Sequence, residues 1–201
     1  GIKSKSKLRL KTKPMPFDQT TRNRLQRFVL EARSLLDDEF TQQCQQDYGL
    51  DPTNGTIADI EVLTHLDSQR IETAKILRDI FVHYQSNEPG QSDGVSKELV
   101  LRIIREQAFT LLNRLVAIRM MEARGIVVVS VGRGLQSDGF QLYSQVAGRG
   151  LGETGDAYAH YLKSIFDEFT EELPGLFDRS SPQGRLFPRE TALNRLLELI
   201  N

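Results

Sequence analysis

The sequence has few of the residues on which several classes of protein depend. It contains one cysteine in 201 residues, Cys44. A single thiol excludes an internal disulfide framework and a cysteine-based zinc site, and it is typical of a protein in a reducing cytosol. No stretch approaches the ~18 consecutive apolar residues of a membrane-spanning helix. The basic start of the chain runs into Pro14 and Asp18, not into the apolar core of a signal peptide. We therefore expect a cytoplasmic protein with no membrane association.

Recognisable catalytic motifs are also lacking. None of His65, His83 and His160 has a second histidine at metal-ligand spacing. The glycine-rich stretch 148–155 precedes a predicted helix and could in principle cradle a phosphate. However, no Gly-Lys-Ser/Thr follows it and no clear strand precedes it, so we expect a plain loop. Cys44 has no basic neighbour in sequence that would activate a nucleophile. The residues therefore predict no complete active site, no metal and no cofactor in this chain.

Positive charge is concentrated at one end of the chain. The net charge is −1, but the first thirteen residues carry six cations and no acid, which leaves −7 on the remainder. A basic arm on an acidic body indicates an anionic partner for the arm. We expect residues 1–16 to form a flexible arm, and Gly1 in place of Met indicates an excised fragment or tag-derived residues in that arm. The candidate DNA contacts in the arm are Lys3, Lys5, Lys7, Arg9, Lys11 and Lys13.

Beyond the arm, apolar residues recur at the three- and four-residue steps of amphipathic helices. Asp18, Asp67 and Ser96 are placed to cap three of these helices at their N-termini. The strongest pattern begins at Ser96 and ends at Arg124. It has too many apolar positions for one narrow stripe, which predicts a central helix contacted on more than one side.

Two segments depart from the helical pattern. Residues 86–95 have loop composition, which predicts a hinge or an excursion. Ile126-Val127-Val128-Val129 is apolar and β-branched, which favours a strand. Because the sequence offers no obvious second strand, the alternative is a short extended connector. We therefore predict an all-α domain over residues 17–201, with several helices around the long central helix and at most a short β segment near 126–131.

Arginines are frequent on the predicted central helix, at positions 102, 105, 114, 119 and 124. Their steps drift around the helix and form no single stripe. One interpretation is a phosphate-binding face, with Arg114, Arg119 and Arg124 as candidate DNA contacts. The other, which we favour, is pairing with acids such as Glu98 and Glu106, or Glu122, and with neighbouring helices. Arginine beside so many apolar positions also indicates buried pairing.

The segment from Arg105 to Gly125 resembles a helix that precedes the catalytic domain of large class I, SAM-dependent bacterial DNA methyltransferases. That group includes type II restriction-modification fusions and methyltransferases of the BREX and DISARM phage-defence systems. The shared elements are Ala-Phe-Thr, Asn-Arg-Leu, Arg-Met-Met-Glu and a final Gly. Three further stretches agree, so that the resemblance runs from about residue 17 to the end: Thr21-Arg22-Asn23 with Leu25, Asp138-Gly139-Phe140 with Leu142-Tyr143, and Arg185-Leu186-Phe187-Pro188.

The resemblance implies that a full-length parent methylates adenine at N6 with S-adenosylmethionine. That chemistry needs a glycine-containing SAM motif and an Asn/Asp-Pro-Pro-Tyr/Phe motif that holds the flipped adenine. This sequence contains neither. We therefore expect an accessory N-terminal domain without the catalytic methyltransferase domain, carrying no catalytic or cofactor residue. It would help hold DNA, or dock onto the catalytic domain or other defence-system proteins.

Two alternatives remain open. One is a stand-alone α-helical protein-interaction module with no nucleic-acid role, which the acidic body favours because DNA-binding domains are usually basic. The other is an unrecognised hydrolase, which has only the glycine-rich stretch 148–155 to support it.

Overall fold

Helices build almost the whole fold, as predicted. The computed structural model describes residues 18–88, 93–147 and 154–201. In chain order the described elements are α1 (Gln19–Gln43), the π-helical turn η1 (Cys44–Tyr48), β1 (Leu50–Asp51), β2 (Thr56–Ile57), η2 (Ile60–Val62), α2 (Ser68–Asn87), α3 (Asp93–Ala123), η3 (Gly134–Gln136), α4 (Asp138–Ala147), α5 (Thr154–Thr170), α6 (Pro174–Phe177), η5 (Pro182–Gly184) and α7 (Glu190–Ile200).

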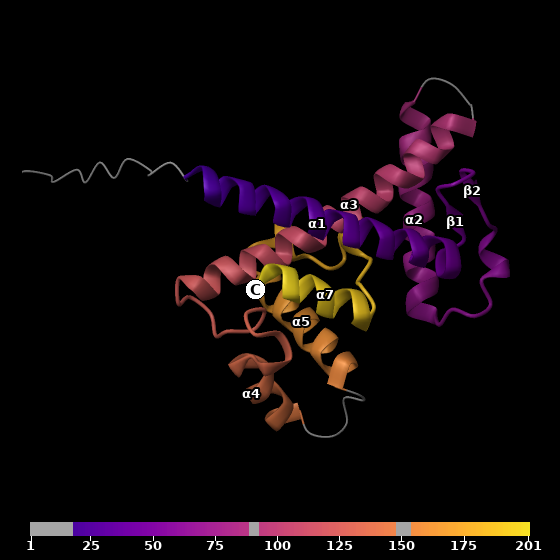
Figure 1. Cartoon of the computed structure of the whole chain (residues 1–201). Helices are drawn as coiled ribbons and strands as arrows, with labels where there is room; N and C mark the ends of the chain where they lie inside the picture. The colour runs from indigo at the N-terminus through magenta and orange to yellow at the C-terminus, as the bar shows by residue number, and fades with distance from the viewer. Residues whose placement is uncertain (1–17, 89–92, 148–153) are drawn as a thin grey trace, which may run out of the picture.

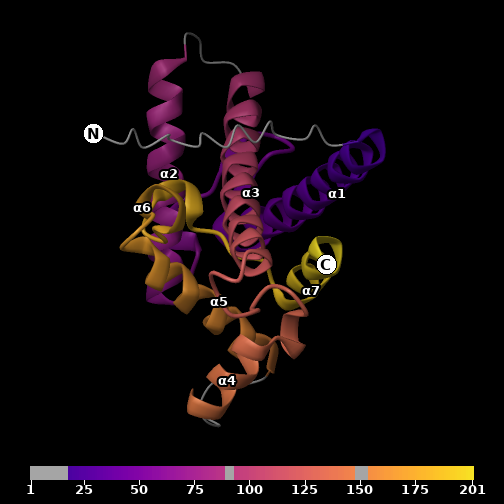
Figure 2. The same cartoon turned by 90° about the vertical axis from the view of Figure 1, so that its left-hand side faces the viewer.

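The long helix α3 passes through the centre of the molecule (Figures 1 and 2). Helices α1, α2 and α6 and the turn η5 all contact it, which confirms a central helix packed on more than one side. Two apolar side chains of α3, Phe109 and Met120, are 60% and 52% exposed. Nine others are buried: Leu99, Val100, Ile103, Ile104, Ala108, Leu111, Leu112, Leu115 and Ile118.

Local signals set the start of two helices as predicted. The Asp18 carboxylate accepts a hydrogen bond from the Thr21 amide at 2.6 Å, and the Asp67 carboxylate accepts one from the Arg70 amide at 2.8 Å. Each is an N-cap that satisfies an otherwise unpaired amide of the first turn. The third predicted cap is wrong, because α3 begins at Asp93 and Ser96 lies inside its first turn.

The short β structure lies elsewhere than predicted. Residues 126–131 form bends and no strand. A strand needs a neighbour for its amides, whereas the amides at the end of this segment bind the Glu122 side chain. The antiparallel pair is instead β1 with β2, with Leu50 opposite Ile57, around the turn that the Asp51–Gly55 stretch suggests.

Three further predictions concern connecting segments. The hinge predicted at 86–95 is shorter in the structure, since α2 ends at Asn87 and α3 begins at Asp93. Its centre, residues 89–92, lies outside the described residues, as do the arm predicted at 1–16 and most of the glycine-rich stretch, 148–153.

Candidate functional site

The predicted DNA-binding residues do not come together on one surface of the described structure. The arm candidates Lys3, Lys5, Lys7, Arg9, Lys11 and Lys13 lie outside the described residues. Arg114 is only 2% exposed. Its guanidinium donates to the carbonyl oxygens of Leu176 at 2.8 Å, Asp178 at 2.7 Å and Gly184 at 3.2 Å. Arg114 is therefore placed inside the protein, where it anchors the segment after α5 and is out of reach of a duplex.

The other arginines of α3 mostly pair with acids of the same helix. Nη1 of Arg119 lies 3.7 Å from the Glu122 carboxylate, and its side chain is 40% exposed. Arg124 is exposed just beyond the C-terminal end of the helix. Arg102 bonds Glu106 at 3.0 Å, and Arg105 lies 4.0 Å from Glu98. Together with the contact between Arg119 and Glu122, these pairs confirm the predicted pairing with all three acids.

Glu122 organises the segment that follows α3. Its side chain has no exposed surface. Oε1 accepts hydrogen bonds from the amides of Ser130 at 2.7 Å and Val131 at 2.6 Å, and Oε2 accepts one from Gly132 at 2.9 Å. Three successive amides directed at one carboxylate are a strong, charge-assisted arrangement. The carboxylate therefore gives the irregular connector, residues 126–133, a fixed shape.

Two tyrosines of α5 secure the same connector from the other side. The Tyr158 hydroxyl donates to the Ser130 carbonyl at 2.9 Å, and the Tyr161 hydroxyl lies 2.6 Å from Ser130 Oγ. Gly139, at the start of α4, is required here because a β-carbon would overlap the Tyr161 hydroxyl. Phe140 packs edge-on against Tyr158 with ring centroids 5.1 Å apart. Burial raises the pKa of both tyrosines, so both hydroxyls remain protonated.

An apolar groove opens beside this connector, between the C-terminal part of α3, the connector, α4 and α5. Its volume is about 540 Å³, within the ~300–1,000 Å³ range of protein binding pockets. Four of its apolar side chains face solvent: Ile126 (63% exposed), Val128 (57%), Leu142 (58%) and Val146 (82%). The remaining apolar lining comes from Ile118, Val127, Tyr143, Tyr161, Ile165 and Phe169. Sequence reasoning did not find this groove, because Val127–Val129 suggested a strand.

The described residues offer no recognisable catalytic chemistry. Among them, no group of three or more His, Cys, Asp or Glu side chains is placed to hold a metal ion. Cys44 is buried, and burial raises the pKa of its thiol to about 12, so the nucleophilic thiolate is scarce at neutral pH. None of the described helices has the length and apolar character to cross a bilayer.

Comparisons with protein-family models, with curated proteins and with solved structures found no match for this chain.

Proposed function

We propose that this chain is a docking domain that packs, through the apolar groove, onto the catalytic domain of a SAM-dependent bacterial DNA adenine-N6 methyltransferase of the restriction-modification or phage-defence kind. The apolar groove is the observation that carries the docking role. Contiguous exposed apolar surface on a soluble domain is unfavourable in water and usually marks an interaction site. Here four exposed apolar side chains surround one groove, Ile126, Val128, Leu142 and Val146.

The walls of the groove are held in place before any partner arrives. Glu122 fixes the connector through three amides, and the tyrosines of α5 bind Ser130 within it. A surface that is already ordered loses little conformational entropy on binding, so more of its apolar burial appears as affinity. A preformed groove supports docking of a folded domain.

The choice of a methyltransferase as the partner comes from the resemblance of the α3 sequence. The residues that carry the resemblance have structural roles here. Arg114 anchors the segment after α5, Glu122 shapes the connector, and Gly139 allows the close approach of Tyr161. Shared residues with such roles support a shared domain structure, and the methylation chemistry then belongs to the catalytic domain with its S-adenosylmethionine.

A matched pair of variants tests the docking role. Val146→Asp places a charge in the groove, whereas Val82→Asp makes the same change on α2, where Val82 is 57% exposed and away from the groove. Binding of each variant to the separately produced catalytic domain is measured by calorimetry. Burying an unpaired carboxylate should weaken binding about ten-fold or more for Val146→Asp and leave Val82→Asp unchanged.

The outcomes separate the two leading hypotheses. Equal weakening by both variants contradicts docking through the groove. If the wild-type chain does not bind the catalytic domain at all, the methyltransferase role is wrong, and the stand-alone protein-interaction module becomes the better hypothesis.

A further inference from the structure

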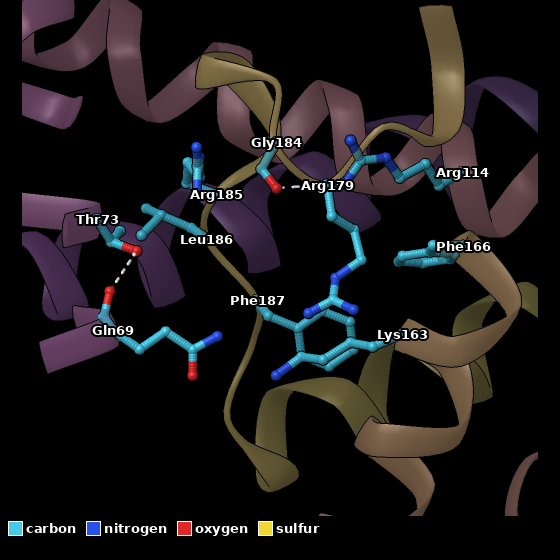
Figure 3. A pocket seen from close by; sticks show the side chains of 10 residues that line it. All are labelled: Gln69, Thr73, Arg114, Lys163, Phe166, Arg179, Gly184, Arg185, Leu186 and Phe187. Carbon is cyan, nitrogen blue, oxygen red and sulfur yellow. Dashed lines mark hydrogen bonds between the residues drawn. The ribbon is translucent and has the colours of Figure 1, made fainter. Parts of the chain in front are cut away.

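A second cavity, far smaller than the apolar groove, lies between α2, α5 and the segment 179–187 (Figure 3). We call it the cationic pocket. Four of the ten residues that line it are cations, Arg114, Lys163, Arg179 and Arg185, and none of the ten is an acid. Since the body of the chain carries net negative charge, this concentration of cations is not an average property of its surface.

The cations of the cationic pocket are only partly satisfied by the protein. Arg179 pairs with Asp167 at 2.5 Å, and Nη2 of Arg185 donates to the Ser180 carbonyl at 2.8 Å. Nε of Arg185 has no hydrogen-bond partner among the described residues, but it is enclosed by protein atoms, so a ligand in the cavity does not reach it.

Of the four cations, Lys163 has the fewest protein groups that offset its positive charge. Within the described residues its ammonium makes no ion pair, and it lies 4.8 Å from the centre of the Phe187 ring. In Figure 3 the side chains of Lys163 and Arg179 both extend toward the Phe187 ring. Burial, and then repulsion from Arg179, lower the pKa of Lys163, while Asp156 only partly opposes them.

The acids around the pocket do not balance its charge. Asp167 is paired with Arg179, and the Asp178 carboxylate accepts hydrogen bonds from the amide and hydroxyl of Ser180. Asp178 also attracts Arg114 and Arg185. Even with Asp156, Asp167 and Asp178 counted, the four cations remain in excess by one around a partly buried cavity. An anion in the cavity would relieve this repulsion.

The size of the pocket limits the anion to a single small group. The cavity measures about 110 Å³. One water needs roughly 10–15 Å³ on such a scale, and a drug-sized ligand occupies ~300 Å³ or more. The cavity therefore has room for one polyatomic ion and not for a nucleobase with its sugar.

We propose that the cationic pocket binds a phosphate group. A phosphate presents several strong acceptor oxygens, and the pocket supplies complementary donors: the ammonium of Lys163, the planar guanidinium of Arg179 and the amide of Gln69. This site is separate from the apolar groove, and the proposal does not depend on the docking function.

The test uses the whole chain and inorganic phosphate. Thermal unfolding is followed in phosphate and in chloride at the same ionic strength and pH. Because a ligand that binds only the folded state raises Tm by mass action, phosphate should raise Tm more than chloride does. Lys163→Gln should weaken phosphate binding about ten-fold or more. Lys75→Gln makes the same change at an exposed site on α2 and should leave it intact.

Two results would overturn the proposal. One is an equal effect of phosphate and chloride on the wild-type chain, and the other is an equal response to phosphate in wild type and Lys163→Gln. If Lys163→Gln fails to fold, the lysine ammonium NMR signal of the wild-type chain takes its place. Phosphate should shift the Lys163 signal saturably and raise the pKa of that lysine, and an unmoved signal contradicts the site.

Further titrations identify the source of the phosphate. Adenosine monophosphate presents a phosphomonoester, and a short DNA duplex presents phosphodiesters. If the phosphate comes from DNA, Lys163→Gln weakens duplex binding and lowers its salt dependence, whereas Lys75→Gln changes neither. If it comes from a small phosphorylated molecule, only the binding of adenosine monophosphate responds to Lys163→Gln.

Discussion

Four buried polar side chains hold the irregular parts of this molecule to its helices: Glu39, Gln107, Arg114 and Glu122. Gln107 shows how each works. Its amide donates to the Pro182 carbonyl at 2.7 Å, and its carbonyl accepts from the amides of Arg185 at 2.8 Å and Leu186 at 3.0 Å. A buried loop is tolerated only when its backbone groups find such partners. One side chain of α3 therefore satisfies three backbone groups of the segment that leads to α7.

Glu122→Ala should be among the most destabilising substitutions in the chain. It leaves the buried amides of Ser130, Val131 and Gly132 without their acceptor, so we expect a loss of about 3 kcal/mol or more from the free energy of unfolding. Glu98→Ala, on the same helix with the Glu98 side chain 71% exposed, is the control and should change it by less than about 0.5 kcal/mol. Urea denaturation measures both, and similar losses would contradict the role of Glu122.

Glu39 should make stability depend on pH. Burial opposes its ionisation, but hydrogen bonds from Arg189 and Gln43 outweigh burial and hold the pKa of Glu39 below its ordinary value of 4.5. A carboxyl whose pKa is lower in the folded state stabilises the fold above its unfolded pKa, and this contribution is lost as pH falls through the folded pKa.

The stability difference between wild type and Glu39→Gln should therefore shrink as the pH falls from about 6 to about 3. Denaturation at a series of pH values measures it. The Gln variant keeps the shape of the side chain but lacks the titrating group, so it isolates Glu39 from the other acids. A difference that stays constant with pH contradicts this account.

At the scale of elements, α3 carries most of the core. Leu115 of α3 is fully buried, so Leu115→Ala should lower the free energy of unfolding by roughly 2–5 kcal/mol, because the neighbouring helices cannot close around the cavity. Met120→Ala, five residues further along the same helix at a 52% exposed position, should cost much less. Chemical denaturation compares them, and equal losses would mean that α3 is not packed as described.

The elements that were predictable are those whose signals are local. The caps at Asp18 and Asp67 and the apolar periodicity of α3 each depend on residues within a turn or two of the helix. The shape of the connector 126–133 was not predictable from its β-branched residues, because it depends on side chains outside it, Glu122 on α3 and Tyr158 and Tyr161 on α5.

The candidate sites were less predictable for the same reason. Arg114 lies 62 residues before Leu176, its first carbonyl partner, and no local pattern shows that it will be buried there. Its burial was foreseen only as a general tendency of arginine beside apolar positions. Both the apolar groove and the cationic pocket bring together residues from several elements, so neither has a signature in one stretch of sequence.

For the molecule as a whole, the charge distribution leads to a prediction about DNA. If the arm binds the phosphate backbone, deleting residues 1–13 should reduce the slope of log affinity against log salt by roughly 0.9 for each phosphate that the arm had neutralised. Fluorescence anisotropy of a labelled duplex measures the slope with and without the arm. An unchanged slope would leave the arm with no role in DNA binding. Any DNA binding would then have to involve exposed arginines such as Arg124, or the cationic pocket.

The contact between Glu39 and Arg189 joins residues 150 positions apart in the chain. During synthesis on the ribosome, α1 emerges long before residues 187–189, whose backbone groups bind the buried side chains of Glu39 and Gln43 on α1. The apolar face of α7 is made later still. Loop closure over such a separation is slow compared with helix formation. The nascent chain therefore exposes the α1 side of its core until α7 is made, and that interval is when aggregation or capture by chaperones is most favoured.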